Sequence, residues 1–495
     1  MNRSGSLARN ALYLVIGQVG TMLLGLLFNR AIAPLGPGEY GLYFLIYSFS
    51  AFALVLVDWG QQLFGIREVA RAPERGGELL GTGLVLRTAG TVLAVLLTAV
   101  AAVALGYDRR TVGFASAFVA LNLPFFLAQN FGIVFRGSDQ MGLDAAVQVG
   151  NRAVGLVLAK TAMWLGLGLA GVVAGQGLAG VVALALAFQL YRRVSLGPLH
   201  FSRDTAGEIL SGGSAILLMT VAVSVQPYID AVLLSKLVPK DAVGWYGAAR
   251  NIYGMLSAPA LILGAAALPR LARATGDPQS FREEMATAER PMVWVAGLGA
   301  VGTWLFSEVV IHLIFPHSGF APAAAILGVF GLGLFLIFVD SLLGTALVAL
   351  GRTAAFSALK LATVVLATVV EIFLIPYFQR RTGNGGLGVV TAFVACEPLI
   401  FAGMLMLIPR GIVGRAFLLN CARAIGSAVL TGAVLRLFPA LTPWLAIPAC
   451  IALYTGISLA VGPLRLHDLR GLGQLFAREL GAVAASAPVK TTTPS

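Results

Sequence analysis

The chain consists of about fourteen long apolar stretches, separated by connections of only a few residues. A helix needs about 20 apolar residues to cross the hydrocarbon core of a bilayer. Hydrophobic residues make up 58% of the 495 positions and charged residues 11%, more apolar surface than a water-soluble fold can bury. The sequence therefore predicts an all-α, polytopic membrane protein. Its predicted spans are 9–33, 41–66, 81–105, 111–135, 145–169, 171–191, 209–235, 244–268, 291–314, 322–350, 355–377, 386–408, 417–437 and 441–463.

Two of these boundaries rest on weak signals. The fifth and sixth spans meet directly at Ala170 and Gly171. The stretch from Pro439 to Pro443 is either a tight turn between two spans or a kink within one. A merger at either place lowers the number of spans by one.

The distribution of Lys and Arg predicts the orientation, because basic residues are retained in short cytoplasmic loops. With a cytoplasmic N-terminus, the connections and tails on that side carry more than twice as many basic residues as those on the other. Both termini are therefore expected in the cytoplasm. Topology and anionic lipid headgroups then account for much of the net charge of +12, so no nucleic-acid partner is required. A short amphipathic helix on the membrane surface is expected after residue 464.

No cofactor is predicted. Cys396, Cys421 and Cys450 lie within spans and lack the spacing of metal ligands, so neither a metal site nor a disulfide is expected. The segment 383–388 fits the pattern GxGxxG but lies between two spans, without the soluble strand that a dinucleotide site requires. No P-loop pattern occurs, so an ATP-driven mechanism would need another subunit.

The chain contains an internal repeat, a common feature of transporters. The connection Pro37 to Tyr43 resembles the connection Pro239 to Tyr246, and the stretch 67–71 resembles 269–273. Residues 171–174 also resemble 388–391. Chance similarity among apolar helices is the alternative. The repeat predicts a six-helix lobe over 1–200, a second six-helix lobe over 201–412, two additional helices over 413–463 and a cytoplasmic tail over 464–495.

The same motifs carry a family resemblance. Residues 35–43, Asp58-Trp59-Gly60, Arg67 to Arg71, Gly244 to Arg250 and Leu268 to Leu271 resemble the polysaccharide-transport branch of the multidrug/oligosaccharidyl-lipid/polysaccharide flippase superfamily. The resemblance implies a non-enzymatic flippase of the bacterial inner membrane. Its expected partners are a lipid-linked oligosaccharide, membrane lipids, and polysaccharide polymerase and assembly proteins. It also implies that Arg250 contacts the lipid headgroup, with Arg30 at the related rim of span one.

Charged residues within the spans are candidates for function, because an ionised group at the bilayer centre costs roughly 2.5–3.5 kcal/mol. Arg152 and Lys160 lie eight residues apart on one span, and both can line a cavity that receives a pyrophosphate. Glu397, Asp340 and Asp230 are candidates for ion coupling. Arg87, Lys360 and Arg423 lie nearer the cytoplasmic ends of their spans, where a long side chain can snorkel to the headgroups.

Two spans carry polar groups around a proline. Asn122 and Gln129 share one face of the fourth span, which either lines a polar groove or bonds to neighbouring helices. In the seventh span, Pro227 lies between Gln226 and Asp230, where it permits either a hinge or a packing kink.

Two other functions remain open on sequence alone. A cation-coupled multidrug exporter of the same superfamily would need an acidic substrate cavity. A polysaccharide polymerase or ligase would need longer loops outside the bilayer than the connections seen here.

Overall fold

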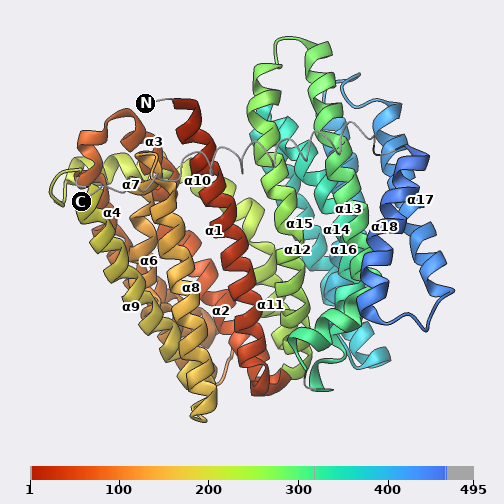
Figure 1. Cartoon of the computed structure of the whole chain (residues 1–495). Helices are drawn as coiled ribbons and strands as arrows, with labels where there is room; N and C mark the ends of the chain where they lie inside the picture. Colours follow the sequence, from red (N-terminus) through yellow and green to blue (C-terminus); the bar gives the residue numbers. More distant parts are fainter. Residues whose placement is uncertain (1–2, 195, 317, 463, 465–495) are drawn as a thin grey trace, which may run out of the picture.

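The computed structural model of the chain describes residues 3–194, 196–316, 318–462 and 464. Every regular element among them is a helix, which agrees with the predicted fold class. The predicted surface helix of the tail lies outside the described residues. Figure 1 shows α1–α9 on one side of the molecule, with α10 beside α1, and α12–α16 on the other side, with α17 and α18 at the far edge.

In the part of the first half that the structure describes, there are nine α-helices. Their bounds are α1 (Arg3–Ile32), α2 (Gly36–Asp58), α3 (Gln61–Arg71), α4 (Gly76–Ala104), α5 (Arg109–Leu121), α6 (Leu123–Asn130), α7 (Gly132–Gly137), α8 (Met141–Trp164) and α9 (Gly168–Val194). The 3-10 turns Ala33–Leu35 and Pro73–Arg75 connect α1 to α2 and α3 to α4.

The described residues of the second half form nine further α-helices. Their bounds are α10 (Arg203–Ser224), α11 (Gln226–Leu237), α12 (Lys240–Arg273), α13 (Pro278–Ile314), α14 (Ala323–Ala349), α15 (Thr353–Thr382), α16 (Gly386–Leu407), α17 (Arg415–Arg436) and α18 (Pro443–Val461). A 3-10 turn, Ser318–Phe320, lies before α14. Both α17 and α18 pack against α13.

The described helices follow the predicted succession of spans. Among the described residues, eleven stretches are long and apolar enough to cross a membrane, and one of them, Ile16–Arg71, includes most of α1 and all of α2. The polar helix α8 and the pair α10–α11 complete the fourteen predicted passes. The two weak boundaries are real separations, since α8 ends at Trp164 before α9 begins at Gly168, and α17 ends at Arg436 before α18 begins at Pro443.

Three predicted spans are interrupted, where the sequence predicted single helices. The span 41–66 breaks at Trp59 and Gly60, whose φ values of 46° and 74° lie in the left-handed region. The span 111–135 consists of α5, α6 and α7. The span 209–235 changes from α10 to α11 at Val225, just before Pro227, whose missing N–H is tolerated in the first turn of a helix.

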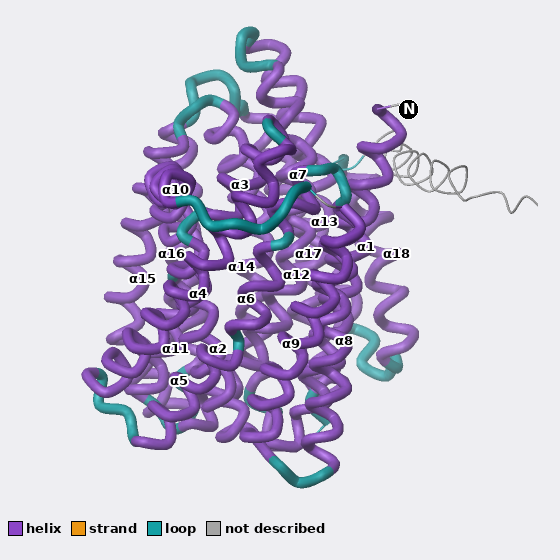
Figure 2. The backbone as a smooth tube through the Cα atoms, turned by 90° about the vertical axis from the view of Figure 1, so that its left-hand side faces the viewer, coloured by secondary structure: helices purple, strands orange, loops and turns teal. Residues whose placement is uncertain are grey.

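The two ends of the helix bundle can be distinguished by the direction of α1. The N-terminal face is the end at which α1 begins, and the opposite face is the end at which α1 stops and α2 begins (Figures 1 and 2). Tyr40 of α2 donates a 2.9 Å hydrogen bond to Asn29 of α1, which requires α2 to fold back along α1, because eleven residues of one helix would span about 16 Å.

At the opposite face, α2 and α12 pack closely through glycine. A Cβ added to Gly41 would lie 2.3 Å from the carbonyl O of Lys240, and one added to Gly244 would lie 2.0 Å from the carbonyl O of Pro37. Any side chain would separate the helices. The two motifs of the predicted repeat, 37–43 and 239–246, therefore lie against each other and hold the two halves together at this face.

At the N-terminal face, the halves are joined mainly through α10. The indole Nε1 of Trp59 donates a 3.0 Å hydrogen bond to the carbonyl O of Leu210. Arg75 forms a 2.9 Å ion pair with Glu208. Next to it, the hydroxyl of Thr205 donates a hydrogen bond to Glu78. These contacts join the break between α2 and α3, the turn before α4 and the start of α4 to α10, along one side of the N-terminal face.

Candidate functional site

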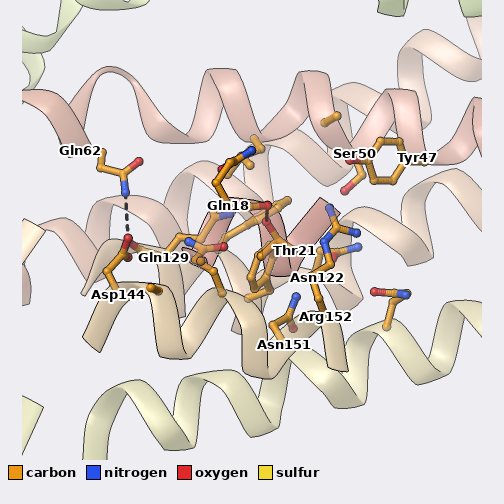
Figure 3. Close-up of a pocket in the computed structure, with 18 of the residues that line it drawn as sticks. Gln18, Thr21, Tyr47, Ser50, Gln62, Asn122, Gln129, Asp144, Asn151 and Arg152 are labelled. Atoms are coloured by element: carbon orange, nitrogen blue, oxygen red, sulfur yellow. Dashed lines mark hydrogen bonds between the residues drawn. The ribbon is translucent and has the colours of Figure 1, made fainter. Parts of the chain in front are cut away.

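A polar cavity of about 510 Å³ lies among the helices of the first half. Figure 3 shows side chains from several helices converging on it. Most of its polar lining consists of amides and hydroxyls, which both donate and accept hydrogen bonds. These residues are Gln18, Thr21, Tyr43, Tyr47, Ser50, Gln62, Asn122, Gln129, Gln148, Asn151 and Gln176.

The charges of this cavity are few. Arg136 and Asp144 form an ion pair of 2.7 Å, and Asp144 is buried. Arg152 of α8 also lines the cavity, and it forms no ion pair with any residue that the structure describes. Its guanidinium therefore provides the cavity with a cation that is available to a ligand, and its planar geometry suits the oxygens of a phosphate.

Asn122 and Gln129 lie in the same cavity as Arg152, and the break between α5 and α6 positions Asn122. The amide of Asn122 donates a 2.7 Å hydrogen bond to the carbonyl O of Phe118, one turn back. The amide of Gln62 bonds at 3.5 Å to the backbone carbonyl of Gln129 (Figure 3). Of the predicted substrate-binding residues, these three line one cavity.

A second compartment of about 240 Å³ extends this cavity toward the other half of the molecule. The two compartments share five lining residues, which are Gln18, Thr21, Tyr43, Tyr47 and Arg152. The second compartment also reaches α12, where Asn251, Gly254 and Met255 line it. The two compartments together are called the polar tract below.

A tyrosine marks the end of the polar tract toward the opposite face. Tyr40 is fully buried, and its hydroxyl accepts a 2.9 Å hydrogen bond from Asn251 while donating to Asn29. Its ring packs edge-on against Phe315 and Phe320, with centroid distances of 5.3 and 5.5 Å. Beyond this cluster lies the close contact of α2 with α12, so the halves are closed on each other at the opposite face.

A separate cavity of about 500 Å³ lies in the second half, and its chemistry differs. It is lined by Arg250, Asp340, Lys360 and Glu397 among many apolar residues. Lys360 donates a hydrogen bond to the buried Asp340, so it does not snorkel, as one reading of the sequence suggested. Glu397 is 3% exposed, and its Oε2 has no hydrogen-bond partner among the described residues.

Arg250 lies in this second cavity and not in the polar tract. Its guanidinium carbon lies 5.3 Å from the ring centre of Tyr253 and 5.7 Å from that of Phe330, within the range of cation–π contacts. The carboxylates of Asp230 and Glu397 interact with it electrostatically. The predicted headgroup contact is thus surrounded by aromatic rings and acids.

Asp230 and Glu371 form a buried pair of carboxyl groups close to Arg250. The hydroxyl of Tyr246 donates a 2.8 Å hydrogen bond to Asp230. Glu371 of α15 is fully buried and interacts electrostatically with Asp230. Two adjacent buried carboxylates repel each other unless a proton or a cation lies between them. Asp230 was among the predicted coupling residues, and its partner Glu371 was missing from that prediction.

Two of the predicted substrate-binding residues lie outside both cavities. Arg30 is exposed near the opposite face, where it donates a hydrogen bond to the backbone carbonyl of Leu313. Lys160 is exposed on α8 and lines none of the cavities described here, so it does not share a cavity wall with Arg152. The physical reason is helix rotation: eight residues turn a helix by about 80° beyond two full turns.

Sequence reasoning also missed some polar contacts. Arg87 is completely buried, forms an ion pair with Asp58 and donates a 2.7 Å hydrogen bond to the carbonyl O of Phe126, so it does not snorkel. On α8, Asn151 and Arg152 lie three and four residues after Gln148, which is the spacing of one helix face. That spacing was the available signal for the polar tract.

Comparisons with known proteins show the family to which the chain belongs. Residues 7–275, more than half of the chain, match the model of a family described as polysaccharide biosynthesis protein. No curated protein sequence matches the chain significantly.

Several solved structures share the fold. The lipid II flippase MurJ in an inward closed conformation has a TM-score of 0.72 and 14% identity, over 91% of this chain and 98% of that one. An inward-facing multidrug resistance MATE family transporter of the MOP superfamily has a TM-score of 0.63 and 17% identity, over 81% and 98%. A MOP superfamily transporter from Pyrococcus furiosus has a TM-score of 0.56 and 18% identity, over 81% and 94%.

The family match and the shared fold agree with the resemblance found in the sequence motifs. The chain therefore belongs to the polysaccharide biosynthesis protein family, and it shares the fold of the solved lipid II flippase and of the solved MOP superfamily transporters.

Proposed function

We propose that this protein is a flippase that moves polyprenyl-pyrophosphate-linked oligosaccharide repeat units across the inner membrane of a bacterium, for O-antigen, capsule or exopolysaccharide synthesis. The observation that carries this proposal is the polar tract, with its many amides and hydroxyls and with Arg152, which forms no ion pair with a described residue. Sugars present neutral hydroxyl groups that such a lining can satisfy, and the pyrophosphate needs a cation. The solved flippase of lipid II has the same fold, which also supports the proposal.

In this proposal, the headgroup enters the polar tract while the polyprenyl tail stays in the lipid. Arg152 binds a pyrophosphate oxygen, and Asn122 and Gln129 bind the sugar. Both termini are cytoplasmic, so the N-terminal face is the cytoplasmic side. The closed contact of α2 with α12 then describes a state sealed toward the outside, and residues 1–200 and 201–412 are the lobes that rock against each other.

The carboxyl pair Asp230 and Glu371, together with the nearby Arg250 and Glu397 of the second cavity, supplies the energy coupling in this proposal. The pair Asp230 and Glu371 binds a proton or a cation, and Glu397 lies close enough to Arg250 to sense the change in charge. Asp340 is already neutralised by Lys360, so its part is to hold α14 against α15. Arg250 acts with the coupling carboxylates, which revises its predicted role as the main headgroup contact.

The test is the binding and flipping of a labelled lipid-linked oligosaccharide by purified protein in proteoliposomes. Removal of a charge-assisted contact costs roughly 1.5–3 kcal/mol, so Arg152→Gln is expected to weaken binding roughly 10- to 100-fold. Arg152→Lys keeps the charge but lacks the planar guanidinium. Its affinity for the lipid-linked oligosaccharide is expected to lie between that of the wild type and that of Arg152→Gln. Lys160→Gln, on the same helix but exposed, is the matched control and should behave as wild type. Wild-type affinity in Arg152→Gln would refute the role of Arg152.

A cation-coupled multidrug exporter is the second candidate. The buried acids of the second cavity and the fold shared with MATE transporters favour it. It predicts efflux of cationic dyes that Arg152→Gln leaves unchanged and that Glu397→Gln abolishes. Flipping of the lipid-linked sugar without dye efflux would exclude this candidate.

A further inference from the structure

An apolar groove of about 550 Å³ lies between the two halves of the molecule. The helix α2 contacts both α4 and α11, and all three line the groove. Its lining includes Phe52, Leu56, Leu97, Leu105 and Ile229. Leu97 and Leu105 are about half exposed, so the groove opens sideways, toward the lipid in a membrane.

The groove leads to a polar pocket of about 360 Å³ at the opposite face. Lys236 lines both the groove and the pocket, so the two spaces are continuous. The ammonium of Lys236 lies 3.3 Å above the ring centre of Tyr107, and the hydroxyl of Tyr107 lies 2.5 Å from that of Ser235. Lys240 lines the far side of the pocket.

The charges of the pocket sum to one positive unit. Lys236 and Lys240 are cations, and Asp108 is the carboxylate that lines the same pocket. Asp108 already accepts a hydrogen bond from the backbone N–H of Thr111, because it caps the start of α5. Hydroxyls of Tyr107, Ser235 and Thr111 complete the polar lining. The pocket therefore favours a ligand that carries one negative charge together with hydrogen-bonding groups.

We propose that the groove and the pocket form a binding site for an anionic glycerophospholipid of the leaflet at the opposite face. One acyl chain lies in the groove, and the phosphodiester lies between Lys236 and Lys240. A phosphodiester carries one negative charge, which matches the pocket, whereas a pyrophosphate carries more. The second acyl chain remains in the bilayer, because the groove is open along Leu97 and Leu105. The site is separate from the polar tract and does not depend on which headgroup the protein transports.

The position of the site has a mechanical consequence. Its walls come from α2 and α4 in the first half and from α11 in the second, so a bound lipid contacts both halves. A ligand that binds one conformation more tightly shifts the equilibrium toward that conformation. The lipid therefore stabilises the state in which the two halves are closed at the opposite face.

The test is native mass spectrometry of the purified full chain with phosphatidylglycerol and with phosphatidylethanolamine. The double variant Lys236→Gln/Lys240→Gln is expected to retain at least about tenfold less phosphatidylglycerol, since charge-assisted contacts to the phosphate are lost. Ala101→Trp, which fills the exposed part of the groove, should reduce binding of both lipids. Arg381→Gln is the matched control, because Arg381 also lies over a tyrosine ring near the opposite face.

Each outcome decides the proposal, provided that thermal unfolding shows all variants to be folded. Equal retention of phosphatidylglycerol by the double variant and the wild type would overturn it, because the lipid would then be bound without its phosphate site. Equal retention of the two lipids by the wild type would also overturn it. A competition with polyprenyl phosphate and polyprenyl diphosphate is the third arm. If either displaces phosphatidylglycerol at equimolar amounts, the site serves the carrier lipid and the glycerophospholipid assignment is wrong.

Discussion

Gly41 of α2 and Gly244 of α12 lie in direct backbone contact at the opposite face, where a Cβ on Gly41 would come within 2.8 Å of the amide N of Gly244. The contact joins the first half of the chain to the second. Its closeness shows that the two halves are fully closed on each other at this end, and it explains why each motif carries a glycine at this point.

Gly244→Ala should prevent this closure, because the added methyl group meets the backbone of Pro37, which cannot rotate away. We expect a loss of transport of at least about tenfold, since a population shift of 1.4 kcal/mol already changes the closed fraction tenfold. Labelling of cysteines introduced at the opposite face should rise. Gly113→Ala is the control, because nothing lies near a Cβ at Gly113. Normal closure in Gly244→Ala would contradict this interpretation.

Lys360→Met should destabilise the protein strongly, because it leaves the carboxylate of Asp340 buried without its partner. Breaking a buried ion pair on one side costs about 3–5 kcal/mol. The double variant Asp340→Asn/Lys360→Met removes both charges and should recover most of that loss. Thermal unfolding in detergent measures both variants. Additive losses in the double variant would show that the two side chains do not depend on each other.

Glu371→Gln and Asp230→Asn should each remove the dependence of transport on an ion gradient. Either change leaves one carboxyl group where two adjacent groups were needed to bind a proton or a cation. Binding of the lipid-linked sugar should change little, because neither residue lines the polar tract. Glu308→Gln, at an exposed position of α13, serves as the control. Unchanged ion dependence in both variants would exclude this pair from coupling.

Arg250→Ala should impair the ion dependence of flipping more than the affinity for the headgroup. The guanidinium lies among Asp230, Glu397 and aromatic rings, and Arg152 supplies the cation of the polar tract. Arg250→Lys keeps the positive charge and should retain part of the coupling. Isothermal titration calorimetry measures the affinity for the headgroup, and flipping driven by an ion gradient measures the coupling. A loss of headgroup affinity as large as that of Arg152→Gln would restore Arg250 as a headgroup contact.

Acidification should loosen the contact of α4 with α10 at the N-terminal face. Hydrogen bonds from Thr205 and Ser202 lower the pKa of Glu78 below its ordinary value near 4.5. A carboxyl group whose pKa is lowered by folding stabilises the folded state above its unfolded pKa, and this contribution is lost as the pH falls below about 4.5. Hydrogen exchange of residues 203–210 at pH 7 and pH 3.5 measures the effect. Glu78→Gln should remove the contribution of this carboxyl group to the pH dependence of exchange. If the variant shows the same pH dependence as the wild type, Glu78 does not control this contact.

The sequence alone determined the membrane fold, because hydropathy acts locally. Each span needs about 20 apolar residues, and this requirement can be read from any stretch without knowledge of the others. The same holds for prolines in the first turn of a helix, such as Pro227 of α11 and Pro443 of α18. The grouping of Asn122 and Gln129 on one face could also be predicted, because the helical period fixes it.

Only the tertiary structure decided which polar residues share a cavity. Arg152 and Arg250 carry the same charge on neighbouring stretches of the bundle, yet one lines the polar tract and the other lies among carboxylates. Asp230 and Glu371 are 141 positions apart in the chain, and nothing in either span indicates that they meet. Helix rotation and the packing of distant helices fix these relationships. They are long-range properties, which a pattern of neighbouring residues does not contain.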